Sequence, residues 1–174
     1  MTASRLVFID ESGAKTNMTR LYGRALAGQR AVDHNPAGNW CTTTMISSVR
    51  SDGSTACMVV NGATDKAVFQ VYVKHILLPT LKAGDIVVLD NLSPHKDKQV
   101  KMIIESAGAQ LWFLPPYSPD LNPIEKMWSK IKSILRTLKA RTEKALIDAI
   151  AKALDAITGG DVKGWFESCG YIFS

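Results

Sequence analysis

Residues 86–90 read Ile-Val-Val-Leu-Asp, a continuous apolar run that ends in an aspartate. Such a run is typical of a strand buried on both faces of a parallel sheet. The same pattern occurs near the start of the chain, where residues 6–10 read Leu-Val-Phe-Ile-Asp. If the two strands are parallel neighbours, Asp10 and Asp90 emerge together at the edge where α/β sheets bind ligands. The alternative is that each aspartate only begins a turn.

The segments between these two runs predict further strands and one helix. Runs bounded by Gly, Asn, Asp or Pro predict strands at residues 21–32, 40–49 and 55–60. The pair Asp52-Gly53 favours a hairpin. Apolar residues then recur at helical spacing over residues 68–78, after Asp65 as the expected N-cap.

The second half of the chain alternates helix and strand and then becomes helical. The pattern predicts a helix around residues 100–104, a strand at 111–114, and helices over 121–138 and 142–157, the last ended by Gly159-Gly160. Strands followed by this alternation indicate an α/β fold, with a mixed β-sheet of about five strands flanked by helices. With 174 residues and no linker, we expect residues 1–174 to form a single domain.

A third carboxylate stands at a predicted helix start, in the segment Ser-Pro-Asp-Leu-Asn-Pro-Ile-Glu of residues 118–125. Asn122 suits the N-cap, Pro123 the first helical position, and Glu125 the third, as in a capping box. A structural role is therefore sufficient for Glu125. However, three carboxylates on rigid elements, Asp10, Asp90 and Glu125, would also suit two Mg²⁺ ions that assist a phosphoryl displacement.

Composition excludes several other classes of protein. The three cysteines, Cys41, Cys57 and Cys169, form no CxxC pair, and the sequence contains no HExxH, P-loop or GxGxxG motif. We therefore expect no zinc ribbon, no disulfide framework and no nucleotide cofactor. Because no signal peptide or membrane-spanning run is visible, we expect a cytoplasmic, nucleoid-associated protein with no membrane partner.

Three segments together resemble a known family. They are FIDESGAKTNMTRLYGRA from residue 8, VVLDNLSPHK from residue 87, and LPPYSPDLNPIEKMWSKIK from residue 114, and 34 residues separate Asp90 from Glu125. The chain resembles the catalytic domain of DDE transposases of the mariner-related superfamily, closest to bacterial insertion-sequence members. The resemblance implies an RNase H-like (integrase-like) fold in which Asp10, Asp90 and Glu125 bind catalytic Mg²⁺, with Mn²⁺ as a substitute.

The resemblance also implies an activity and partners. Such enzymes are metal-dependent endonucleases and polynucleotidyl transferases that cut DNA at transposon ends and then use the freed 3′-hydroxyl to attack target DNA. Full-length members carry an N-terminal helix-turn-helix domain, which this sequence lacks before Asp10. The expected partners are therefore DNA, a second copy of the chain on DNA, and a separate DNA-binding polypeptide.

The formal charge of +5 permits a polyanionic partner, and the basic residues gather in two stretches. One runs from Lys126 to Lys144 and the other from Lys15 to Arg30. A solvated helix face is the alternative to a phosphate track. With polar residues beside the carboxylates, the candidate DNA contacts are Lys15, Arg20, Arg24, Asn91, His95, Tyr117, Lys126, Lys130, Lys132 and Arg136. Trp112, Trp128 and Trp165 are expected in the core.

Two other functions remain open at this point. One is a metal-dependent nuclease of the same fold that only hydrolyses DNA. The other is a non-catalytic, DNA-binding remnant of a transposase. The presence of all three carboxylates argues against a remnant.

Overall fold

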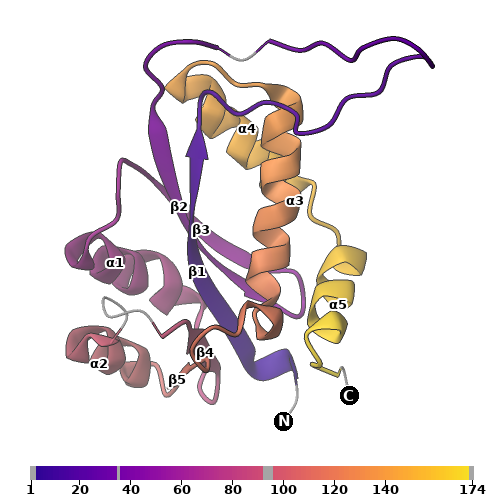
Figure 1. Ribbon diagram of the computed structural model, residues 1–174. Helices are drawn as coiled ribbons and strands as arrows, with labels where there is room; N and C mark the ends of the chain where they lie inside the picture. The colour runs from indigo at the N-terminus through magenta and orange to yellow at the C-terminus, as the bar shows by residue number, and fades with distance from the viewer. Residues whose placement is uncertain (1–2, 35, 92–95, 173–174) are drawn as a thin grey trace.

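The structure is a computed structural model that describes residues 3–34, 36–91 and 96–172. Its centre is a mixed five-stranded sheet with the strand order β3-β2-β1-β4-β5. Helices cover both faces of this sheet, α1 and α2 on one face and α3 and α5 on the other (Figure 1). The predicted α/β architecture, a mixed sheet of about five strands flanked by helices, is confirmed.

The sheet combines an antiparallel meander with two parallel strands. β1 pairs antiparallel with β2, and β2 with β3, whereas β4 lies parallel to both β1 and β5. Gly53, at φ 87°, turns the chain between β2 and β3 as the sequence predicted. The strand bounds are β1 Leu6–Lys15, β2 Thr42–Arg50, β3 Thr55–Asn61, β4 Ile86–Leu89 and β5 Gln110–Phe113.

Helices connect and cover these strands. Asp65 caps α1, since its Oδ1 accepts a hydrogen bond from the Val68 N–H at 2.8 Å, which confirms the predicted cap. Short helical turns occur at Ala3–Arg5, Val73–Leu77, Leu78–Thr80 and Pro119–Leu121. The α-helices of the described residues are α1 Lys66–Tyr72, α2 Lys98–Ser106, α3 Pro123–Leu138, α4 Glu143–Asp155 and α5 Gly159–Ser168.

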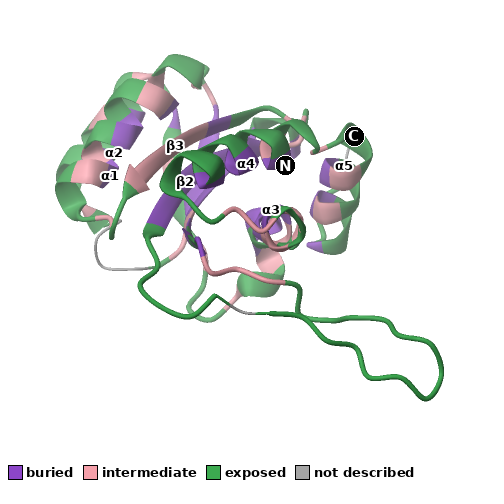
Figure 2. Cartoon of the chain, turned by 90° about the horizontal axis from the view of Figure 1, so that it is seen from above, coloured by how far each residue is buried: buried purple, intermediate pink, exposed green. Residues whose placement is uncertain are grey.

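Alternation along the strands sorts their side chains into two cores. Leu6 and Phe8 of β1 pack with α3, α4 and α5, whereas Val7 and Ile9 pack with α1 and α2. The buried residues of these elements lie in the middle of the molecule in Figure 2. Each face of the sheet therefore has its own apolar layer, and the phase of β1 decides which residues face α3.

The prediction of a strand at residues 21–32 is wrong. The described residues between β1 and β2 form an exposed arm without regular structure that projects away from the body (Figures 1 and 2). Its apolar residues, including Leu21, Tyr22 and Leu26, are 66%, 88% and 74% exposed. They mimic a strand in composition, but the arm buries no face against a neighbouring strand, which is what stabilises strands.

Two further expectations about the helices and the core are also wrong. Gly159-Gly160 does not end the helical region but begins α5, because Thr158 and Asp161 form a capping box ahead of it. Trp112 is not a core residue, since it lies on the outermost strand β5 and is 44% exposed. Trp165 is half-buried against the core.

No helix among the described residues is long and apolar enough to cross a membrane.

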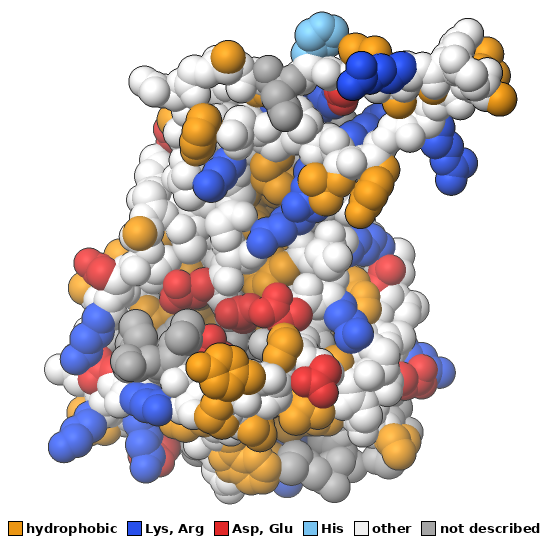
Figure 3. All heavy atoms as spheres, viewed as in Figure 1, with side chains coloured by type: hydrophobic (Ala, Val, Ile, Leu, Met, Phe, Trp, Pro, Cys, Tyr) orange, Lys and Arg blue, Asp and Glu red, His pale blue; other side chains and the backbone are white. Residues whose placement is uncertain are grey.

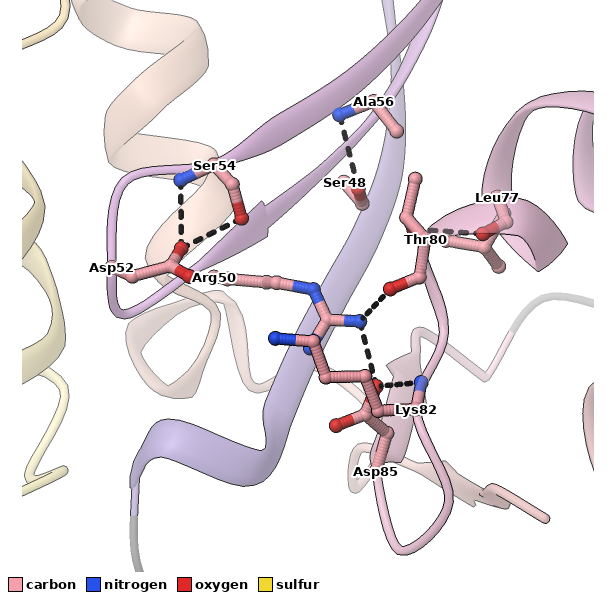
Figure 4. A network of polar contacts seen from close by, with 9 residues as sticks. All are labelled: Ser48, Arg50, Asp52, Ser54, Ala56, Leu77, Thr80, Lys82 and Asp85. Atoms are coloured by element: carbon pink, nitrogen blue, oxygen red, sulfur yellow. Dashed lines mark hydrogen bonds and ion pairs between the residues drawn. The ribbon is translucent and has the colours of Figure 1, made fainter. Parts of the chain in front are cut away.

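One buried ion pair joins the two halves of the sheet at the end opposite to Asp90. The Arg50 guanidinium, at the end of β2, donates to Asp85 Oδ2 at 2.7 Å and to the Thr80 carbonyl at 2.9 Å. Asp85, just before β4, also accepts the Lys82 N–H at 2.7 Å (Figure 4). Both charged side chains are more than nine-tenths buried, so each depends on the other for compensation.

Replacing Arg50 by methionine should lower the free energy of unfolding by about 3–5 kcal/mol, because it leaves the Asp85 carboxylate buried without its counter-charge. Urea denaturation measures this loss. Lys101→Met is the matched control, since Lys101 forms an exposed pair with Glu105, and we expect a change below about 0.5 kcal/mol there. Equal losses in the two variants would contradict the assignment.

Candidate active site

The register of the parallel pair brings Asp10 and Asp90 to the same level of the sheet. Phe8 of β1 lies opposite Val88 of β4, so two residues further on each chain reaches an aspartate. Asp10 shares the face of Leu6 and Phe8, which is the face that α3 covers. The expectation that Asp10 ends its strand is wrong, because β1 continues to Lys15 along β2 after β4 has ended.

Asp10 is held by a contact from α3. The buried Trp128 donates its indole N–H to Asp10 Oδ2 at 3.2 Å, and Asp10 itself is only 9% exposed. Trp128 follows Glu125 by three residues, so α3 presents both side chains from one turn of helix. This bond joins the first strand of the sheet to the helix that carries Glu125.

Glu125 stands in the first turn of α3, but not as a capping-box residue. The Asn122 side chain makes no capping hydrogen bond, and the Asn122 N–H donates to the Pro119 carbonyl instead of to Glu125. The predicted capping box is therefore wrong. The Glu125 side chain is exposed, and its carboxylate makes no hydrogen bond or ion pair among the residues that the structure describes.

The three carboxylates line one cavity of about 360 Å³. Its wall is completed by the segment after β5 and by the residue after Asp90, namely Leu114, Pro115, Pro116, Tyr117, Ser118, Pro119, Asn122 and Asn91. Acidic side chains gather in the middle of this face, below a group of basic ones that extends toward the arm (Figure 3). The sequence prediction that residues 10, 90 and 125 converge is thus met in the geometry of the cavity.

Burial raises the pKa of Asp10 from an ordinary 3.8 to about 7. The neighbouring charges of Glu125 and Asp90 contribute to this rise in pKa, while the Glu11 N–H and the Trp128 indole oppose it. Asp10 is therefore close enough to both other carboxylates to be repelled by their charges. A cation in the cavity would relieve both the desolvation and the repulsion.

The donor set of the cavity suits a hard cation, although it is not a closed cage. All its candidate ligands are oxygen atoms, which Mg²⁺ prefers. Asn122 adds one more, because its Oδ1 is buried and has no hydrogen-bond partner in the described part of the chain. Within the same residues, no group of three or more His, Cys, Asp or Glu side chains is already assembled around one ion position.

The predicted DNA contacts fall into separate groups. Asn91 and Tyr117 line the cavity of the carboxylates, and Tyr117 projects fully exposed from a backbone with φ 59°. His95 lies outside the described residues. Arg20 and Arg24 lie in the arm beside Lys139.

The basic residues of α3 divide between its two sides. Lys126 and Lys130 lie toward α5, where Lys130 is paired with Asp161. Lys132 and Arg136 lie with Lys15 of β1 around a second cavity. The structure therefore brings Lys15, Lys132 and Arg136 together, and separates Lys126 and Lys130 from them.

Three residues that support the site were not found by sequence reasoning. Trp128 reads as a core residue, and nothing in its spacing shows that its N–H reaches Asp10. Tyr171 donates its hydroxyl to the Leu121 carbonyl at 2.8 Å and so fixes the turn that leads into α3. Asn122 reads as an N-cap, whereas its side chain makes no capping hydrogen bond and the residue lines the cavity.

The raised pKa of Asp10 predicts a dependence of metal-free stability on pH. The folded state binds this proton more tightly than the unfolded state, so its stabilising effect is complete below pH 4 and is lost as the pH rises toward 7. Relative to wild type, Asp10→Asn should gain roughly 3–5 kcal/mol between pH 4 and pH 8. Urea unfolding with a chelator measures it.

Asp148→Asn, an exposed change on α4, controls for the loss of one charge. A constant difference between wild type and Asp10→Asn across this pH range would show that Asp10 has no raised pKa.

Comparisons with known proteins agree with this geometry. The family model described as DDE superfamily endonuclease matches residues 5–147, which include all three carboxylates. A comparison with curated proteins gave no match. Among solved structures, the Mos1 strand transfer complex superposes with a TM-score of 0.74 at 17% identity, covering 96% of this chain and 52% of that one.

Two further solved structures show how much of those proteins the chain represents. The Mos1 mariner paired end complex with Mn gives a TM-score of 0.71 at 17% identity, over 95% of this chain and 52% of that one. The catalytic domain of Mos1 mariner transposase gives 0.62 at 15% identity, over 98% and 85%. The chain thus spans about half the length of the proteins in the strand transfer and paired end complexes. At identities of 15–17%, the likeness establishes the RNase H-like fold. The match over most of its length shows that the chain belongs to the DDE superfamily of endonucleases.

Proposed function

We propose that this chain is the catalytic core of a transposase, which cuts DNA at transposon ends and joins the freed 3′-hydroxyl to target DNA. The observation that carries the proposal is the cavity lined by Asp10, Asp90 and Glu125, one from a strand, one from a strand end and one from a helix start. Membership of the DDE superfamily supports it. Among solved relatives of the same fold are a strand transfer complex and a paired-end complex with a transposon end.

The proposal includes two divalent ions, Mg²⁺ or Mn²⁺, held by Asp10, Asp90 and Glu125. Relatives of this fold were solved with Mn and with Mg. The all-oxygen lining and the orphaned Asn122 Oδ1 suit such ions. When bound, two ions activate a water and stabilise the charge on the attacking and leaving oxygens of a phosphoryl displacement.

The protein residues contribute position and charge. Asp10 is fixed by the Trp128 indole and by pairing on β1, so its carboxylate is preorganised toward the cavity. Glu125 reaches the same cavity from solvent, which leaves it free to adjust when substrate enters. Tyr117 and Asn91 at the rim offer a ring for stacking and an amide for hydrogen bonding to DNA.

The proposed partner is DNA, and two copies of the chain acting together on a pair of transposon ends form part of the proposal. The basic side chains above the acidic centre give the duplex a favourable approach (Figure 3). The proposal also includes a separate DNA-binding polypeptide that recognises the transposon end.

Glu125→Gln should lower Mg²⁺-dependent cutting by about 100-fold or more, because it removes one charged ligand of the ion site. Folding should be unchanged, since the side chain is exposed. Nicking of a supercoiled plasmid and joining of a 3′-hydroxyl duplex to that plasmid measure the two steps. Glu105→Gln, an exposed change on α2, is the matched control.

The outcomes separate the candidate functions. Unchanged DNA cutting by Glu125→Gln would contradict the assignment of the carboxylates as ligands of the catalytic ions. Cutting by wild type without joining would favour a nuclease that only hydrolyses, and DNA binding without either step would favour a non-catalytic remnant.

A further inference from the structure

A second cavity, of about 450 Å³, lies between β1, the start of the arm and α3. We call the side chains of Lys15, Lys132 and Arg136 in its lining the basic pocket. Gly13 of β1 also lines it, and an added Cβ there would meet nothing within 4 Å, so the strand surface at this residue is open to a ligand. Parallel pairing of β1 with β4 stops at Phe8, which leaves this stretch of the edge uncovered.

The charges of the basic pocket are uncompensated within the described part of the chain. Three other cations of this region have acceptors: Lys130 pairs with Asp161, Lys139 pairs with Asp33, and Arg141 donates to the Thr16 and Met18 carbonyls. Lys15, Lys132 and Arg136, by contrast, make no ion pair with a described carboxylate. Three cations that line one cavity without a counter-charge repel one another, and an anion in that cavity lowers this cost.

The position of the basic pocket relative to the carboxylates follows from two elements that run side by side. Trp128 contacts Asp10 near the start of α3, and Arg141 contacts Thr16 beyond its end, so α3 and β1 run in the same direction. Figure 1 shows both running toward the arm. Lys15 is five residues along β1 from Asp10, which corresponds to roughly 17 Å.

The helix gives a matching distance. Lys132 and Arg136 lie two and three turns beyond Glu125 on the same side of α3, at roughly 10 and 16 Å along its axis. Two independent elements therefore place the basic pocket about 10–17 Å from the carboxylates, or about three to five base-pair steps of a DNA duplex.

We infer that the basic pocket binds one backbone phosphate of the DNA, three to five base pairs from the phosphate that is cut. The inference rests on the proposed function, since it takes the carboxylates as the point of cutting. Its chemistry is charge-assisted and independent of base sequence, so it fixes the register of the duplex and contributes affinity without specificity.

The first experiment measures binding of a fluorescent 30-base-pair duplex by anisotropy at several NaCl concentrations. Lys132→Gln/Arg136→Gln should weaken binding about tenfold and reduce the slope of log K against log salt by about one, the value expected for one lost phosphate contact. Lys152→Gln/Lys163→Gln, with the same change of net charge on α4 and α5, is the control. If the control loses as much, or the pocket variant loses nothing, the inference is overturned.

The second experiment locates the phosphate. A duplex with a free 3′-hydroxyl carries one neutral methylphosphonate at successive positions, and joining to a plasmid is timed. Only DNA ends that occupy the active site are joined. The position of each methylphosphonate is therefore counted from the 3′-hydroxyl end that is joined. Neutralising a phosphate three to five base pairs away should slow wild type about tenfold and leave Lys132→Gln/Arg136→Gln unaffected.

The two proposals fail separately. Equal responses of wild type and variant at every position would overturn the basic pocket while leaving the transposase assignment intact. If wild type does not join ends at all, the proposed function fails, and the anisotropy comparison alone decides whether the pocket binds a phosphate.

Discussion

The site depends on one hydrogen bond in the interior, from the Trp128 indole to the Asp10 carboxylate. A carboxylate that is 9% exposed is unfavourable when charged, and only a fixed donor or a cation makes it acceptable. Trp128 can donate but not accept, so it favours the charged form and orients it. Because Trp128 is also a large core residue of α3, the packing of that helix and the placement of Asp10 are set together. The Phe8–Val88 register then adds Asp90 at the same level.

That the three carboxylates would lie together could be predicted from local patterns for Asp10 and Asp90, and with the family resemblance for Glu125. Asp10 and Asp90 end apolar runs whose composition indicates buried parallel strands, and Glu125 follows an Asn-Pro pair that marks a helix start. The details that failed depend on long-range packing. Leu21 to Val32 has the composition of a strand but no partner to pair with, and the Asn122–Glu125 capping geometry gives way to a short helical turn at Pro119. No local pattern shows that Trp128 meets a residue 118 positions away.

The basic residues also show that the sequence alone does not reveal which charges are paired in the folded chain. The net charge of +5 and the basic run along α3 suggest a single phosphate track. The contacts divide it: cations that brace the fold, such as Lys130, Lys139 and Arg141, already have acceptors. Among the basic residues without an ion pair in the described part of the chain, Lys15 of β1 and Lys132 and Arg136 of α3 line one cavity. A count of basic residues therefore overstates the positively charged surface that is available to a polyanion, because some of these residues are already paired within the fold.

The carboxylates come from the two ends of a long stretch of chain, with Asp10 on the first strand and Glu125 on a helix that follows the last one. Contacts of such sequence separation form late, after the closure of large loops. During synthesis the cavity can therefore exist only once α3 has emerged and packed on the sheet, and the turn that leads into α3 is held by Tyr171, near the C-terminal end. The proposed ion binding and DNA cutting would then require completion of the fold, so that a nascent or partly unfolded chain would leave the DNA around it intact.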